Sequence, residues 1–70
     1  MTKLSERLFL LRKEEKLTQA EAAKGMEIPF STYRRYEKNE REPDASTLVR
    51  MADFYQVTLD FLVGRSDRRD

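Results

Sequence analysis

The chain has 70 residues, which is enough for one domain with a modest core. It contains no Cys and no His, so a disulfide and a thiolate metal site are excluded, and the commonest general base and the strongest nucleophile are both missing. We therefore expect no enzyme activity, no metal site and no cofactor. The 14 Lys and Arg residues nearly balance the 13 Asp and Glu residues, and a net charge of +1 does not by itself indicate a nucleic-acid partner.

The longest apolar run, Leu8–Leu11, has four residues, far fewer than the ~20 that span a bilayer. The beginning of the chain also lacks a basic segment followed by an apolar stretch and a small-residue cleavage site. We therefore expect a cytoplasmic protein without membrane contact.

The first half of the chain predicts two helices. Leu4, Leu8 and Leu11 recur at helical spacing, which predicts a helix within residues 3–15. Thr18 and Glu21 have the spacing of a capping box, in which each side chain bonds the backbone of the other residue. This pair predicts the start of a second helix over about 18–25.

A third helix is expected to begin near Pro29, because proline is favoured in the first turn. It should end at Glu37 or Lys38, with Asn39 in the left-handed conformation after it. The link of about three residues, 26–28, between two short helices is typical of a helix-turn-helix unit. The inward residues of this unit would be Ala22, Ala23, Met26, Ile28, Tyr33 and Tyr36, and the outward residues of the third helix Phe30, Ser31, Thr32, Arg34, Arg35 and Lys38.

The last third of the chain predicts two more helices. Asp44 caps a helix on which Leu48, Met51, Ala52 and Tyr55 share one face. Thr58 caps a short helix that Gly64 closes. Residues 65–70 contain no apolar side chain, so we expect a domain over 1–64 and a flexible tail over 65–70. With no strand pattern along the chain, the predicted fold is all-α with five helices.

Short sequence fragments spread over residues 4–64 form a further pattern. Its residues are Arg7, Leu8, Leu11, Arg12, Leu17, Thr18, Gln19, Ser31, Thr32, Arg35, Tyr36, Glu37, Arg41, Glu42, Pro43, Thr47, Leu48, Ala52, Val57, Thr58, Leu59, Asp60, Leu62 and Gly64. Each fragment is weak alone, but their order and spacing together are specific. In this pattern the chain resembles the Cro and phage-repressor (Xre-type) helix-turn-helix family. The resemblance implies a compact lambda-repressor-like fold.

Two positions depart from the family pattern. Glu27 stands in the turn, and Gln56 stands before the last Val, where the family commonly has Gly. A left-handed backbone costs a residue with a Cβ atom roughly 1 kcal/mol. We interpret both departures as tolerated costs.

The resemblance also implies the roles of individual residues. The third helix would lie in the major groove of double-stranded DNA, and the protein would act as a homodimer on a palindromic operator, as a sequence-specific repressor of transcription. Base contacts are assigned to Phe30, Ser31, Arg34 and Arg35, and phosphate contacts to Gln19, Thr32, Lys38 and Arg41. Arg12 and Glu37 would form a structural ion pair. We place the dimer interface on the last two helices, which carry more apolar surface than a five-helix core needs, at Val57, Leu59 and Phe61.

Each role has a simpler alternative. Arg34 and Arg35 could form an ordinary solvated helix face, and Gln19 could be a surface residue. Phe30 could belong to the core or staple a helix end. Tyr33 and Tyr36 are assigned to the core rather than to DNA.

A second function keeps the fold without strong DNA binding: a protein-interaction module or an antitoxin-type adaptor. The small net charge favours it, as do Phe9 and Leu10, which stand where the family usually has polar residues. These two residues either widen the core, perhaps against the tail, or form a patch for a protein partner. A third helix whose outer face is basic and free of carboxylates would favour DNA binding.

Overall fold

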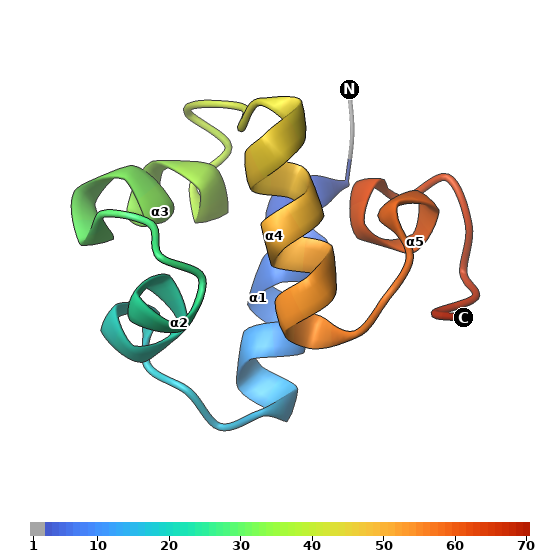
Figure 1. Ribbon diagram of the computed structural model, residues 1–70, viewed down its shortest axis with the longest axis horizontal. Coiled ribbons are helices and arrows are strands. Elements are labelled where there is room, and N and C mark those ends of the chain that lie inside the picture. The colour runs from blue at the N-terminus through green and yellow to red at the C-terminus, as the bar shows by residue number, and fades with distance from the viewer. Residues whose placement is uncertain (1–2) are drawn as a thin grey trace.

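The computed structural model describes residues 3–70, and these residues form five helices and no strand (Figure 1). The all-α fold predicted from the sequence is therefore confirmed. Each helix boundary lies within two residues of the expected one. The helices are α1 (Leu4–Glu14), α2 (Gln19–Gly25), α3 (Phe30–Glu37), α4 (Ala45–Tyr55) and α5 (Leu59–Val63).

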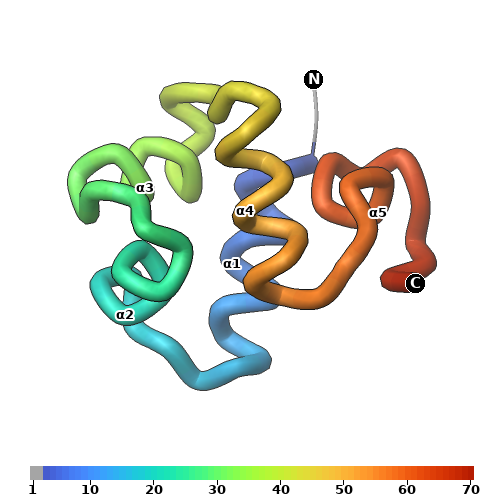
Figure 2. The backbone as a smooth tube through the Cα atoms, in the orientation of Figure 1, coloured from blue at the N-terminus to red at the C-terminus, as the bar shows by residue number. Residues whose placement is uncertain are grey.

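Helices α1 and α4 occupy the middle of the molecule (Figures 1 and 2). Helices α2 and α3 form one end, and α5 with the C-terminal residues forms the other. Helix α1 contacts both ends, because it packs against α3 on one side and against α5 on the other. The α2–α3 pair is thus held from one side only, and its other side faces outward.

Side chains cap the beginnings of three helices where the sequence predicts them. At α2, Thr18 accepts a hydrogen bond from the Glu21 backbone N–H, and the Glu21 carboxylate accepts one from the Thr18 N–H. Asp44 accepts from the Thr47 N–H at α4, over 2.9 Å. Thr58 caps α5 in the same way. Each cap satisfies an N–H group that has no partner within its own helix.

The C-terminal ends share one geometry. After each described helix, one residue adopts a left-handed backbone conformation, and two backbone hydrogen bonds close the last turn. At α2, for example, the Ile28 N–H bonds the Ala23 carbonyl and the Glu27 N–H bonds the Lys24 carbonyl. Glycine is favoured in this conformation because it lacks a Cβ atom. The five left-handed residues are Lys16, Glu27, Asn39, Gln56 and Gly64, so four of the five carry a side chain.

The core lies between α1 and the other four helices. The inward residues predicted for the helix-turn-helix unit are all buried, and Tyr33 and Ala22 are fully inaccessible. Leu48, Tyr55, Val57 and Leu17 are partly buried against this core. The core residues are Leu4, Leu8, Leu11, Ala22, Ala23, Met26, Ile28, Tyr33, Tyr36, Met51, Ala52, Phe61 and Leu62.

Residues 65–70, which we expect to form a flexible tail, contact the rest of the domain in this structure. They turn back beside α5, and the Arg69 carbonyl accepts a hydrogen bond from the Thr58 N–H. Arg69 also forms two hydrogen bonds of 2.7 Å to the Glu14 carboxylate of α1, and Arg7 bonds Asp67 over 2.9 Å. These contacts are ionic and polar, so the absence of apolar side chains in residues 65–70 does not indicate them.

Candidate nucleic-acid interface

Helices α2 and α3 are joined by a tight turn that sets their angle. The turn begins at Met26, passes through the left-handed residue Glu27, and ends at Pro29, where α3 starts. Ile28 lies inside the turn and is 6% exposed, so its side chain fixes the turn to the core. The resulting helix–turn–helix presents the outer side of α3 to solvent.

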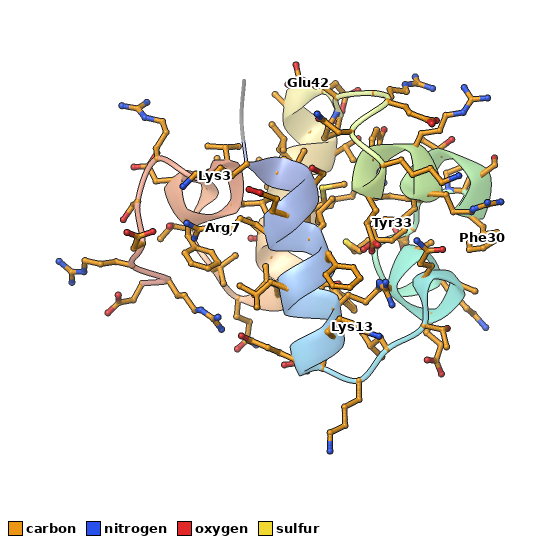
Figure 3. The ribbon with its side chains drawn as sticks, turned by 180° about the vertical axis from the view of Figure 1, so that it is seen from behind. Lys3, Arg7, Lys13, Phe30, Tyr33 and Glu42 are labelled. Atoms are coloured by element: carbon orange, nitrogen blue, oxygen red, sulfur yellow. The ribbon has the colours of Figure 1, made fainter. Side chains whose placement is uncertain are left out.

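Helix α3 has one buried and one exposed face. Tyr33 points towards α1, whereas Phe30 projects away from the body of the molecule at the outer end of the helix (Figure 3). Phe30 is 47% exposed, so it is not a core residue. Of the other outward candidates, Ser31, Arg34, Arg35 and Lys38 are exposed, and Thr32 is half-buried.

The exposed face of α3 carries no free carboxylate. Glu37 is the one acidic residue of α3, and its side chain is only 5% exposed because it turns inward to Arg12. Arg34 and Arg35 are exposed on the same helix, and Lys38 follows it. The face is therefore basic although the chain as a whole is nearly neutral. A basic face without free carboxylates favours DNA binding over a protein-interaction module.

A buried ion pair joins α1 to α3. The Arg12 guanidinium donates from Nε to Glu37 Oε2 over 2.6 Å and from Nη2 to Oε1 over 3.1 Å. A third donor of Arg12 bonds the Leu17 carbonyl over 2.9 Å. The pairing is bidentate and both side chains are less than a tenth exposed, so it fixes the orientation of α3 relative to α1.

Two further groups donate to the same carboxylate. The Tyr33 hydroxyl lies 2.5 Å from Glu37 Oε2, and the Gln19 amide lies 3.2 Å from Oε1. Burial alone would raise the pKa of Glu37, but the hydrogen bonds from Arg12, Tyr33 and Gln19 outweigh it, so this pKa lies below its usual value. Burial also raises the pKa of Tyr33, and its hydrogen bond to Glu37 adds to the increase. Glu37 is therefore ionised and Tyr33 is neutral near pH 7.

Gln19 therefore has a structural contact that the sequence did not suggest. It begins α2, is half-buried, and uses one amide hydrogen for Glu37. An amide nitrogen carries two hydrogens, so this bond leaves a second donor. Arg41, in the loop after α3, is exposed and makes no hydrogen bond or ion pair within residues 3–70.

The three residues proposed for the dimer interface differ in exposure. Leu59 is 44% exposed, and Val57 is partly buried against the core. Phe61 is only 4% exposed, because α5 turns it inward between the guanidinium groups of Arg7 and Arg69, at 4.1 and 5.0 Å from the ring centre. In this arrangement Leu59 is available to a second subunit and Phe61 is not.

Phe9 and Leu10 are not part of a wider core, which was one of the two interpretations. They are 51% and 42% exposed. The Phe9 ring lies within 6 Å of the cationic groups of Arg12 and Lys13.

The fold and this surface define a class of protein. A capped α2, a tight turn, an α3 with a basic outer face, and three supporting helices constitute a helix-turn-helix domain.

Known proteins give the same class. A family model described as helix-turn-helix matches residues 8–62, and the chain belongs to this helix-turn-helix family, of the Xre type. The chain is 34% identical over 64 residues to the HTH-type transcriptional regulator ImmR of Bacillus subtilis, covering 91% of this chain and 50% of ImmR. It is 38% identical over 63 residues to the cryptic phage CTXphi transcriptional repressor RstR of Vibrio cholerae, covering 90% of this chain and 56% of RstR.

A solved structure is also similar. The crystal structure of a transcriptional regulator from Listeria innocua matches with a TM-score of 0.84 and 30% identity, covering 91% of this chain and 60% of that one.

The chain spans about half the length of the curated relatives that it matches. These relatives are named as regulators rather than enzymes. Within residues 3–70, every helix is too short or too polar to cross a lipid bilayer.

Proposed function

We propose that this chain is the DNA-binding part of a sequence-specific transcriptional regulator, a repressor that acts as a homodimer on a palindromic operator. The observation that carries the proposal is the outer face of α3, which is basic and has no free carboxylate because Glu37 is turned inward. The names of the relatives, a transcriptional regulator and a phage repressor, support it.

In the proposed complex, α3 lies in the major groove. Arg35 can donate two hydrogen bonds to guanine O6 and N7, and Ser31 can bond either partner of a base pair. Phosphate contacts fall to Gln19 at the start of α2, Thr32 on α3, and Lys38 and Arg41 after α3. Such contacts position the protein without selecting a sequence.

A second subunit would double these contacts. We place the dimer interface on the exposed Leu59 with Val57 beside it. Two symmetric copies would set their α3 helices about 34–36 Å apart, one turn of the duplex. The operator would then contain two half-sites on one face of the DNA.

The first experiment is a binding titration against a site selected in vitro from random duplexes. Affinity should fall by orders of magnitude between ~50 and 200 mM salt, because several phosphates release their counterions on binding. Absence of binding to every duplex at low salt would refute the proposal.

The second experiment separates sequence recognition from phosphate contact. Arg35→Ala should weaken binding to the selected site about 5- to 150-fold and relax the preference at one base pair. Arg41→Ala should weaken selected and scrambled duplexes by similar factors. Both residues are exposed, so neither change should alter the melting temperature by more than a few degrees. If Arg35→Ala lowers both affinities equally, Arg35 contacts phosphate and base recognition lies elsewhere on α3.

Phe9 and Leu10 support a second candidate function, a protein-interaction module. Both side chains are exposed on α1. A double variant with Ser at both positions would lose the partner but keep DNA affinity if the two functions are separate. If the double variant keeps both its partner binding and its DNA affinity, this candidate function is removed.

A further inference from the structure

Phe30 and Arg34 form a pair on the outer face of α3. They lie one helical turn apart, and the Arg34 guanidinium carbon is 5.6 Å from the centre of the Phe30 ring. A cation at this distance from an aromatic ring is attracted to it. The Arg34 guanidinium makes no hydrogen bond or ion pair within residues 3–70, so its N–H donors are free.

The pair adds little to the fold. Phe30 is 47% exposed and points away from the rest of the protein (Figure 3). The ring instead holds the flexible Arg34 side chain close to it, which restricts the positions that the guanidinium group can take. An apolar ring and a five-hydrogen donor therefore stand side by side at the end of the helix that would enter the groove.

The chemistry of these two groups matches two different base edges. An aromatic or aliphatic side chain packs against the C5-methyl group of thymine, and the guanidinium fork donates to guanine O6 and N7. Consecutive bases of one strand are separated by about 3.4 Å along the duplex axis. Two side-chain groups 5.6 Å apart can therefore contact neighbouring base pairs at the same time.

We propose that Phe30 and Arg34 act as one recognition unit for a thymine directly adjacent to a guanine, with the thymine methyl group packed against the Phe30 ring. This inference rests on the proposed function and adds the operator chemistry to it. It also makes the protein sensitive to base methylation. A 5-methylcytosine carries its methyl group at the same major-groove position as thymine, so it replaces thymine better than cytosine does.

The test uses the site selected in vitro and changes single atoms of the DNA. Deoxyuridine lacks only the methyl group, so replacing the thymine of one half-site should weaken binding about fourfold, as expected for one buried methyl group. Phe30→Ala should remove this difference, so that thymine and deoxyuridine duplexes bind equally. Phe9→Ala is the matched control, because Phe9 is equally exposed on α1 and also contacts cations. It should keep the fourfold difference.

The variant Arg34→Lys tests the contact between the Arg34 guanidinium and guanine. Lysine retains the charge but lacks the planar fork, so the preference for guanine over the other bases should fall about tenfold or more, while binding to scrambled DNA changes little. With cytosine or 5-methylcytosine at the thymine position, wild-type protein should bind the methylated duplex more tightly, and Phe30→Ala should bind both equally.

The outcomes separate this inference from the proposed function. A selected site without adjacent thymine and guanine, or an unchanged affinity for the deoxyuridine duplex, refutes the recognition unit but leaves DNA binding intact. A deoxyuridine effect that persists in Phe30→Ala refutes the role of the ring. Failure to bind any duplex refutes both.

Discussion

Replacing Arg12 by Ala should destabilise the domain severely, although Arg12 is not a DNA-contact residue in our proposal. The change leaves the Glu37 carboxylate buried without its cation, and breaking a buried pair costs about 3–5 kcal/mol. Tyr33 and Gln19 still donate hydrogen bonds to Glu37. The loss in the free energy of unfolding should therefore lie near the lower end of this range, at about 3 kcal/mol. A domain of this size has a total stability of about 4–10 kcal/mol. The melting temperature should therefore fall by about 12–24 °C.

Thermal melts followed by circular dichroism measure this effect. Lys13→Ala is the control, because Lys13 is the next residue on α1 and is exposed, and it should melt within a few degrees of wild type. The double variant Arg12→Ala/Glu37→Ala should lose less than the sum of the two single variants, since the two groups interact directly. A melting temperature of Arg12→Ala within ~3 °C of wild type would show that the pair is not important for stability.

The remaining predictions concern pH and single polar groups. The folded-state pKa of Glu37 lies below the usual 4.5, so its ionisation contributes fully to the free energy of unfolding above pH 4.5. This contribution is lost as pH falls through the folded-state pKa. Stability should therefore fall less steeply with decreasing pH in Glu37→Gln than in wild type. Tyr33→Phe removes a hydrogen bond to a carboxylate and should cost about 1.5–3 kcal/mol in denaturant unfolding. The Tyr55 hydroxyl is buried without a hydrogen bond of good geometry in residues 3–70, although it interacts with the Tyr33 side chain, so Tyr55→Phe should cost less than Tyr33→Phe in the same assay. Gln56→Gly should raise stability by up to ~1 kcal/mol, because Gln56 is left-handed, whereas Gln56→Ala should leave it nearly unchanged.

Much of the fold could be predicted because its boundaries depend on short-range chemistry. Thr18, Asp44 and Thr58 each bond an N–H group three residues further on, and such local pairs appear directly in the sequence. The position of Asn39 after α3 was predicted from its tolerance of the left-handed conformation. Lys16 adopts the same conformation, but a lysine gives no comparable indication of it.

Contacts between distant segments could not be predicted in the same way. The ion pairs of Arg7 and Arg69 join residues about 55 to 60 positions apart, and in a chain this rich in charge many alternative pairings exist. The inward rotation of Phe61 depends on how α5 is set against α1, which the apolar pattern of five residues does not determine. For α3, the separation of faces followed from helical spacing and the Arg12–Glu37 pair from the family resemblance. The hydrogen bonds that Tyr33 and Gln19 donate to Glu37 had no signal in the sequence.

The buried and the exposed face of α3 can evolve independently of each other. Tyr33, Tyr36 and Glu37 hold the helix in place, whereas Ser31, Arg34 and Arg35 are exposed and contribute little to that attachment. If the exposed residues contact bases as we propose, substitutions there will alter target preference with little effect on folding. The eight-residue helix behaves as an exchangeable cassette: its outward side chains could be transplanted onto a related domain, or replaced by those of one, without redesigning the scaffold.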